Sequence, residues 1–245
     1  MPSPQYPITL TGKKQLSDNT IQLDFEFDGA GGTGFNYIAG QFIQFFIETA
    51  GKLQKRSYSI ASSPEDFKDS GKLSIALSFV EDGLASQLFA NAPPGLKLQM
   101  AGPFGVLTLP KAFNGQLVLV GTGTGIAPYK AMIPQLKTLA GKGLPITVIM
   151  GVRHRHDLIY QSDFTDLSHA DYRICLSREP DINSAENEYT GYVQQQFSAL
   201  NLNPETDLVY LCGNPAMVDS AATGLKEAGF PSRQVKREKY VYSGH

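Results

Sequence analysis

The stretch of residues 116–128, "QLVLVGTGTGIAP", decides how the second half of the chain folds. Its continuous apolar run, 116–120, is typical of a strand buried on both faces of a parallel sheet. Gly121, Gly123 and Gly125 follow at once, and a helical pattern continues to Leu139. Glycines let the backbone approach a ligand closely, and free N–H groups at a helix start suit a pyrophosphate. The spacing GxGxG is neither the GxGxxG fingerprint nor a Walker phosphate loop, so an ordinary strand-to-helix turn remains the alternative.

The same rhythm continues to the end of the chain. Apolar runs recur at 146–150 ("ITVIM"), 173–176 and 208–212 ("LVYLC"), and segments with helical patterns follow at 193–200 and 216–228. Buried apolar strands that alternate with helices indicate a parallel sheet covered on both faces. We therefore expect an α/β nucleotide-binding domain over residues 111–245.

The first half has a different period, which indicates antiparallel β structure. Ile21, Leu23, Phe25 and Phe27 alternate with polar residues, as in a half-buried strand. Further strands are expected at 41–48, 53–60, 72–80 and 96–100, separated by turn sequences. Short strands at this spacing predict a small antiparallel β-barrel over residues 1–110, with one short helix near 84–91.

Composition places the chain among ordinary globular proteins. It has 245 residues, 42% of them hydrophobic and 18% charged, and a formal net charge of −2. This charge does not favour nucleic-acid binding, and no apolar run reaches the length of about 18 residues that a membrane span needs. Cys175 and Cys212 are too few for an iron–sulfur or structural zinc site, so we expect no metal and any redox cofactor to be organic. The N-terminus lacks the pattern of a secretory signal, so we expect a cytoplasmic protein.

The strand sequence of residues 55–64, "KRSYSIASSP", places two unusual side chains on one face. Arg56, Tyr58 and Ile60 point one way in an extended chain, and Ser57 and Ser59 point the other way. Arg56 and Tyr58 are then about 6.5 Å apart, a separation that suits the phosphate and the ring system of a flavin nucleotide. The alternative is an exposed strand edge with polar residues.

Polar residues that follow the other strands of the second half are candidates for nucleotide binding. Arg178 follows the third predicted strand, where an arginine can hold the 2′-phosphate of NADP, and Arg153 after the second strand is a candidate phosphate contact. A solvated loop arginine is the alternative at each position. His154 and His156 lack a third metal ligand. Cys212 ends the last strong strand and has no histidine partner for a nucleophile, so it is either a buried inert thiol or a small group beside a flat ring.

Seven motifs occur in order along the chain. They are Arg56-Ser57-Tyr58-Ser59, Glu81-Asp82-Gly83-Leu84-Ala85-Ser86, Gly102-Pro103-Phe104-Gly105, residues 121–128, Ser177-Arg178-Glu179, Cys212-Gly213-Asn214-Pro215-Ala216-Met217 and Glu238-Lys239-Tyr240. In this order they resemble the ferredoxin–NADP reductase family, and most of all its short bacterial members. The resemblance spans nearly the whole chain. It implies a flavin-binding barrel, an NADP-binding domain, hydride transfer between NADPH and FAD, and passage of single electrons to a separate ferredoxin or flavodoxin.

The resemblance also assigns site residues. It implies that Arg56 neutralises the FAD pyrophosphate, that Tyr58 packs on the flavin ring and that Ser59 hydrogen-bonds near its N5 atom. Ser59, Cys212 and Glu238 match the family residues around the hydride-transfer centre. The FAD set is Arg56, Ser57, Tyr58, Ser59, Ala76, Leu77, Ser78, Gly83, Leu84, Ala85, Ser86, Thr124, Tyr240 and Tyr242. The NADP set is Gly123, Thr124, Gly125, Arg153, Ser177, Arg178, Tyr192, Cys212, Gly213, Asn214 and Pro215.

Two positions depart from the family pattern. Plant-type members end at the tyrosine that matches Tyr240, whereas this chain continues through Tyr242, so either tyrosine is a candidate cover for the flavin. Tyr192 stands near the place of a lysine or arginine that holds NADP in other members, which leaves Arg178 as the main 2′-phosphate contact. We therefore expect NADPH as the preferred coenzyme, with NADH as the alternative.

Three functions remain open at this point. The leading one is an FAD-containing NADPH reductase for ferredoxin or flavodoxin, expected to act as a monomer. The second is the reductase component of an oxygenase, or a reductase that takes free flavin as substrate. The third is a non-catalytic nucleotide sensor, which the intact Ser59, Cys212 and glycine loop disfavour.

Overall fold

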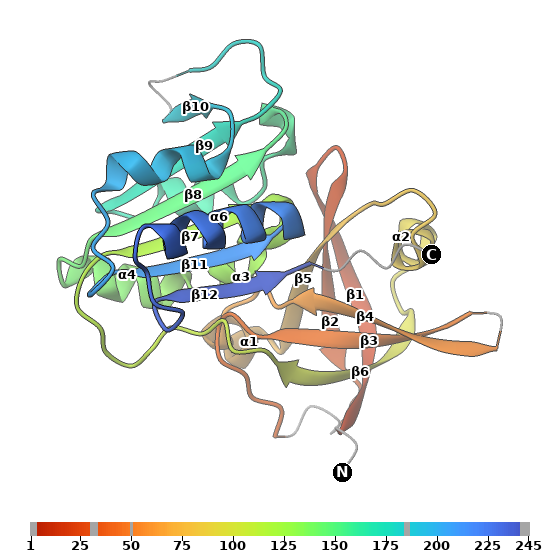
Figure 1. Cartoon of the computed structure of the whole chain (residues 1–245). Coiled ribbons are helices and arrows are strands. Elements are labelled where there is room, and N and C mark those ends of the chain that lie inside the picture. Colours follow the sequence, from red (N-terminus) through yellow and green to blue (C-terminus); the bar gives the residue numbers. More distant parts are fainter. Residues whose placement is uncertain (1–3, 30–33, 50, 184–186, 241–245) are drawn as a thin grey trace. The chain divides into compact units, whose positions relative to one another are not determined.

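A computed structural model describes residues 4–29, 34–49, 51–183 and 187–240 of the chain (Figure 1). The chain divides into two compact units. The first comprises residues 1–108 together with 127–132, and the second comprises residues 109–126 and 133–245.

The first unit is built on an antiparallel sheet. Its strands are β1 (Gln5–Ser17), β2 (Thr20–Phe27), β3 (Phe42–Thr49), β4 (Lys52–Ser59), β5 (Lys72–Ser78) and β6 (Lys97–Phe104). They are ordered β4-β3-β6-β1-β2-β5. The two outer strands of this order meet again, because Ile60 bridges Ile75 and the Ala61 N–H donates to the Ser74 carbonyl at 2.8 Å. The sheet thus closes on itself, which confirms the predicted antiparallel barrel.

Alternation along the strands fills the barrel with aromatic side chains. In β3, buried Ile43, Phe45 and Ile47 alternate with more exposed residues. Phe45 is fully buried, and its ring centroid lies 4.9 Å from that of Phe25 and 5.8 Å from that of Phe89. Phe89 comes from helix α2 (Leu84–Asn91), which has the bounds that the sequence predicts. This helix therefore completes the core of the barrel.

A second helix in this unit, α1 (Pro64–Ser70), was not predicted. None of its residues is buried, so it has no apolar periodicity to detect. Local chemistry defines it instead. Ser63 and Asp66 form a capping box, Pro64 stands in the first turn, and Gly71 ends the helix with a φ of +72°.

The second unit contains a parallel sheet. Its strands are β7 (Leu117–Thr122), β8 (Ile146–Val152), β9 (Ala170–Leu176), β10 (Glu188–Thr190), β11 (Leu208–Gly213) and β12 (Val235–Lys239), in the order β10-β9-β8-β7-β11-β12. Among the described residues, the neighbouring strands of this sheet all pair in parallel. Strands β7, β8 and β11 are buried along almost their whole length, as strands covered on both faces are. The predicted α/β architecture is confirmed.

The helical segments after β7 differ from the single helix predicted through Leu139. The chain forms the 3₁₀ helix η2 (Gly123–Ile126), then α3 (Ala127–Ala131) and then α4 (Ile133–Gly141). Pro134 has no N–H group to donate, and in a continuous α-helix its ring would clash with the carbonyl of residue 130. The break before α4 is therefore expected. The remaining helical elements are η3 (Arg155–Asp157), α5 (Gln161–Thr165), η5 (Val193–Leu200) and α6 (Pro215–Glu227).

Strand β12 was also absent from the sequence prediction, because its run of charged residues, 236–239, suggests a surface loop. In the structure this run pairs with β11, and Glu238 lies in register with Cys212. Within the described part of the chain, no helix is long and apolar enough to cross a membrane.

Candidate functional site

Strand β4 presents Arg56 and Tyr58 on the face of the sheet that carries the barrel core. Arg56 pairs across the sheet with Phe45, and Tyr58 pairs with Ile43. The guanidinium of Arg56 donates to two neutral oxygens, the Lys55 carbonyl at 2.9 Å and Gln54 Oε1 at 2.7 Å. Among the described residues it has no carboxylate partner, so its positive charge is uncompensated and fits a phosphate group.

The aromatic neighbour of Arg56 is fixed by the core beneath it. The ring of Tyr58 lies 5.6 Å from that of Phe45, and burial raises the pKa of its hydroxyl to about 12 although Arg56 opposes the shift. Ser59 ends β4 and is buried, whereas Ser57 is exposed on the opposite face and accepts a hydrogen bond from Gln44 at 3.2 Å. The predicted alternation of faces therefore holds through Tyr58. Ser59, which was expected on the same face as Ser57, is buried instead.

The start of helix α2 offers backbone donors. Gly83 caps the helix with no side-chain hydrogen bond, and the preceding Asp82 has a φ of +55°. A Cβ on Gly83 would lie 3.0 Å from the Val80 carbonyl and from Ser86 Oγ, which explains why glycine stands here. Ser86 Oγ accepts a bond from the Val80 N–H at 2.8 Å and keeps its own O–H to donate. This turn fits an anionic group such as a pyrophosphate.

Strand β5 carries three further FAD candidates of the first unit, Ala76, Leu77 and Ser78. Leu77 is 1% exposed and belongs to the barrel core, so only its backbone can face a ligand. Ala76 and Ser78 point to the other face of the strand, where Ser78 Oγ lies 2.8 Å from Thr20 Oγ1.

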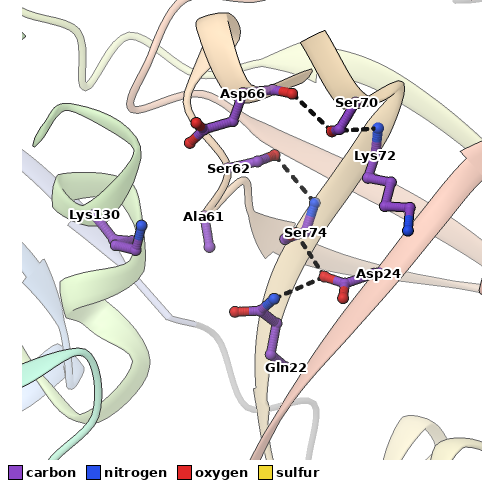
Figure 2. Close-up of a pocket in the computed structure, with 9 residues that line it drawn as sticks. All are labelled: Gln22, Asp24, Ala61, Ser62, Asp66, Ser70, Lys72, Ser74 and Lys130. Atoms are coloured by element: carbon purple, nitrogen blue, oxygen red, sulfur yellow. Dashed lines mark hydrogen bonds between the residues drawn. The ribbon is translucent and has the colours of Figure 1, made fainter. Parts of the chain in front are cut away.

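The first unit contains a polar pocket of about 230 Å³, and Figure 2 shows the residues that line it. It is lined by Gln22, Asp24, Ala61, Ser62, Asp66, Ser70, Lys72, Ser74 and Lys130. Asp24 Oδ1 accepts hydrogen bonds from Gln22 and from Ser74 Oγ at 2.8 and 2.6 Å, and the Ser74 N–H donates to Ser62 Oγ at 3.1 Å. These bonds join β2, β5 and the segment after β4 where the barrel closes. The pocket shares no residue with the predicted FAD set.

In the second unit the glycine loop after β7 packs backbone against backbone. A Cβ on Gly125 would lie 2.3 Å from the Cys212 carbonyl oxygen, and one on Gly213 would lie 2.5 Å from Thr122 Oγ1. Gly123, at the crest of the loop, has a φ of +54°, and a Cβ there would meet nothing within 4 Å. The loop is therefore fixed at its base and open at its crest, as close approach of a ligand to the backbone requires.

The segment after β11 is tied to this loop. The Asn214 N–H donates to Thr122 Oγ1 at 2.9 Å, and Asn214 Oδ1 accepts from the N–H groups of Ala216 and Met217 at the start of α6. Pro215 follows as the first residue of that helix. Thr122 was not among the predicted site residues, although it stands inside the glycine motif. Its hydroxyl joins the glycine loop to the segment after β11.

Cys212, Glu238 and Tyr240 lie together at the end of β11. Cys212 is fully buried, and burial raises the pKa of its thiol well above 9.0, with a further rise from the charge of Glu238. The Tyr240 N–H donates to the Gly213 carbonyl, and its hydroxyl donates to the Thr124 carbonyl, each at 2.9 Å. Tyr240 thereby connects the C-terminal strand with the glycine loop. Tyr242, the other predicted flavin cover, lies outside the described residues.

The carboxyl ends of β8, β9 and β10 carry the other predicted coenzyme contacts. The N–H groups of Ser177 and Arg178 donate to the carbonyls of Val152 and Arg153 at 3.0 and 2.9 Å, which places the two arginines on adjacent chain segments. Tyr192 is 65% exposed beyond β10. In the described part of the chain, neither the Arg153 nor the Arg178 guanidinium has a hydrogen-bond or ion-pair partner. Two uncompensated arginines on adjacent chain segments fit a phosphate dianion.

Arg155 was also missed, because in the run of residues 153–157 only Arg153 was chosen as a phosphate contact. Its guanidinium binds Glu188 instead of standing free. The rings of His154 and His156 stack at 5.2 Å. No group of three or more candidate metal ligands occurs among the residues that the structure describes.

Comparison with known proteins identifies relatives along most of the chain. The family model of an oxidoreductase FAD-binding domain matches residues 7–109, and that of an oxidoreductase NAD-binding domain matches residues 119–223. Ferredoxin–NADP reductase B of Sorangium cellulosum is 29% identical over 243 residues, which cover 94% of this chain and 96% of that protein. The toluate 1,2-dioxygenase electron transfer component of Pseudomonas putida is 28% identical, and the match covers 97% of this chain and 68% of that protein.

A solved structure supports the same fold. The ferredoxin–NADP⁺ reductase from Neisseria gonorrhoeae, with bound FAD and NADP, aligns with a TM-score of 0.80 and 21% identity over 97% of this chain and 99% of that one. The antiparallel barrel and the parallel sheet correspond to the FAD-binding and NAD-binding domains that the two family models describe. The chain belongs to the ferredoxin–NADP reductase family and is an oxidoreductase that binds FAD and a nicotinamide dinucleotide.

Proposed function

We propose that the protein transfers hydride between NADPH and FAD and passes single electrons between FAD and a separate ferredoxin or flavodoxin. The observation that carries this proposal is the match to ferredoxin–NADP reductase B over nearly the full length of both proteins. FAD supplies the conversion between two-electron and one-electron chemistry, and the protein supplies binding, orientation and electrostatics.

In the first unit, Arg56 and the start of α2 would hold the FAD pyrophosphate. Arg56 brings an uncompensated charge, and the turn at Gly83 brings free N–H groups. Tyr58 would support the flavin ring, since its own ring is already fixed against Phe45. Ser59 would donate a hydrogen bond near the reacting nitrogen. Ser57, Ala76, Leu77, Ser78, Leu84, Ala85 and Ser86 complete the proposed FAD contacts.

In the second unit, the open crest at Gly123 would admit the coenzyme pyrophosphate, and Arg153 and Arg178 would hold the 2′-phosphate. Tyr192 would stack on the adenine. Cys212 and Glu238 would lie beside the nicotinamide, where Glu238 would position it or relay a proton. Tyr240 would cover the flavin until NADPH displaces it, since stacking contributes only about 0.5–1.5 kcal/mol beyond burial. The remaining proposed coenzyme contacts are Thr124, Gly125, Ser177, Gly213, Asn214 and Pro215.

An absorbance spectrum of the purified protein, followed by anaerobic titration with NADPH and NADH in separate experiments, tests the proposal. We expect a flavin spectrum that survives gel filtration and is bleached by one equivalent of NADPH. A protein that loses FAD and turns over added flavin would be a free-flavin reductase. Bound flavin that NADPH fails to bleach would indicate a nucleotide sensor.

Substitution of Arg178 tests the coenzyme preference. We expect Arg178→Ala to raise the KM for NADPH about tenfold or more, because a charge-assisted contact with the phosphate is lost, while the KM for NADH changes less than about twofold. Arg233→Ala is the matched control, since Arg233 is an exposed arginine of the same unit outside the proposed site. Equal effects on both coenzymes would show that Arg178 does not hold the 2′-phosphate.

The acceptor is tested by electron transfer to an acidic ferredoxin. Lys55, Arg56, Lys236, Arg237 and Lys239 are the proposed docking residues, and we expect the reduction rate to fall as ionic strength rises. The likeness to the toluate dioxygenase component favours an oxygenase reductase as the second candidate. A clear preference for an oxygenase partner over ferredoxin and flavodoxin would select that candidate.

We also propose a domain boundary at residues 110/111 and a cytoplasmic monomer. Limited proteolysis should cut first near this boundary. Light scattering should give a mass near 26.6 kDa for the apoprotein. Fractionation of cells should place the protein in the cytoplasmic extract.

A further inference from the structure

Arg155 lies in the turn η3, two residues beyond Arg153, and its side chain is fully engaged. Its Nε donates to Glu188 Oε1 and its Nη2 donates to Glu188 Oε2, both at 2.6 Å. This is a bidentate fork between a guanidinium and a carboxylate. Glu188 is only 1% exposed in its side chain, and the hydrogen bonds from Arg155 hold the pKa of that carboxyl below its usual range.

Arg155 also contacts the segment that begins at Arg178. Its backbone N–H donates to Glu179 Oε2 at 2.9 Å, and its Nη2 donates to the Asp181 carbonyl at 3.1 Å. One residue of the β8 loop therefore binds Glu179 and Asp181 in the connection between β9 and β10, and Glu188 at the start of β10. Glu179 adjoins Arg178 directly in the chain.

These contacts fix the backbone on both sides of Arg178. On one side its N–H group donates to the Arg153 carbonyl, and on the other its neighbour Glu179 is bonded to Arg155. Arg155 binds two carboxylates of this region, Glu179 and Glu188. The guanidinium groups of Arg153 and Arg178 are left without acidic partners in the described structure.

We propose that Arg155 and Glu188 form a clamp that positions Arg178 and Arg153 for the 2′-phosphate of the coenzyme, and thereby sets coenzyme selectivity without contact with the coenzyme. This inference rests on the proposed NADPH site. Net stability is a weak explanation of the fork, since the Arg155 side chain is 43% exposed and an ion pair that is open to solvent contributes little. What the fork does provide is a fixed geometry, because only arginine presents the planar bidentate donor set.

Binding of two nucleotide probes to the FAD-loaded full chain tests the clamp. Adenosine 2′,5′-bisphosphate carries the 2′-phosphate, and adenosine 5′-monophosphate lacks it. We expect Arg155→Met and Arg155→Lys each to weaken the bisphosphate about tenfold in calorimetry and to change the monophosphate less than about twofold, because misplaced partners lose affinity through geometry. The ratio of KM for NADPH to KM for NADH should rise in parallel, with kcat little changed.

Arg173→Met is the matched control. Arg173 is an arginine of the same sheet, in the middle of β9, and it is bonded to Asp171 Oδ2 at 2.7 Å and to Gln196 Oε1 at 3.3 Å. Its loss should leave the ratio of the two probe affinities at the wild-type value. Should Arg155→Met fail to fold, Arg155→Lys and Glu188→Gln carry the test, since both keep most side-chain atoms and both should lose bisphosphate affinity selectively.

Three results would overturn the clamp. They are equal weakening of both probes, no weakening of either, and wild-type affinity in Arg155→Lys, which would show that charge suffices without the fork. Arg178→Ala separates this inference from the proposed function. If Arg178→Ala is selective for the bisphosphate and the Arg155 variants are not, only the clamp fails. If Arg178→Ala weakens both probes equally, the proposed 2′-phosphate site itself fails.

Discussion

The two units hold their candidate ligand-binding residues in different ways. In the first unit the residues are side chains, Arg56 and Tyr58, that stand on a regular strand above an aromatic core. In the second unit the site is made largely of backbone, because Gly125 and Gly213 pack against the carbonyl of Cys212 and the hydroxyl of Thr122. The first arrangement depends on the core beneath it, and the second depends on the absence of side chains.

The largest expected effect comes from the barrel core. Phe45→Ala should lower the free energy of unfolding by about 3–5 kcal/mol, because a fully buried ring is replaced by a cavity. It should also weaken FAD retention, since Tyr58 packs on Phe45. Denaturant titration and the flavin content after gel filtration measure the two effects. Phe46→Ala, in the next residue on the opposite face, should cost far less, and similar losses for both variants would contradict this account.

A single methyl group should disable the second unit's loop. A Cβ in Gly125→Ala would lie 2.3 Å from the Cys212 carbonyl, so the loop must shift. We expect flavin reduction by NADPH to slow at least about tenfold, or about 1.4 kcal/mol, while the flavin spectrum stays unchanged. Stopped-flow absorbance gives the rate. Gly141→Ala is the control, because a Cβ there meets nothing within 4 Å, and a wild-type rate in Gly125→Ala would exclude the tight packing.

Alkaline pH should destabilise both units through buried acids. Burial raises the pKa of Cys175 and of Tyr210 to about 12 in the second unit, and that of Tyr58 to about 12 in the first. Below about pH 8 these groups are largely neutral in the folded and the unfolded chain, so stability is at its full value there. As pH rises from about 8 to about 12 the unfolded chain ionises first, and stability should fall. Urea titrations at several pH values measure this, and a flat profile up to pH 12 would contradict the burial of these groups.

The smallest expected effect is a gain. A Cβ on Gly224, inside helix α6, would meet nothing within 4 Å, and no positive φ requires glycine there. Gly224→Ala should therefore raise the free energy of unfolding by about 0.5–1 kcal/mol through helix propensity. Thermal unfolding measures it. A loss of stability would mean that the helix surface at this position is needed for another contact.

The sequence predicts most of the framework because apolar periodicity is strong in both halves. The alternation of Ile21, Leu23 and Phe25 predicts strand β2 of the barrel. The run of residues 116–120 predicts β7, a strand buried on both faces. Elements without buried side chains gave no such signal. Helix α1 is defined by its caps and by one partly buried ring, Phe67, and β12 is charged but forms because β11 offers a partner strand.

The candidate site is predictable where a local motif carries it and hidden where contacts between distant segments do. Arg178 and the glycine loop can be recognised in the sequence because each directly follows a predicted apolar strand. The fork between Arg155 and Glu188 joins residues 33 positions apart, so no local spacing in the sequence predicts it. The same holds for the bond from Asn214 to Thr122, which spans 92 positions.

The ends of the parallel sheet have a consequence for association between chains. A long, uncharged strand edge invites a second chain to add a strand and so begins aggregation. Here β10 has only three residues, and β12 carries four consecutive charged residues, 236–239. The short length of β10 disfavours strand addition at one edge of the sheet, and the charges of β12 disfavour it at the other. The described part of this sheet therefore presents two poor templates for strand addition, which favours solubility at high concentration.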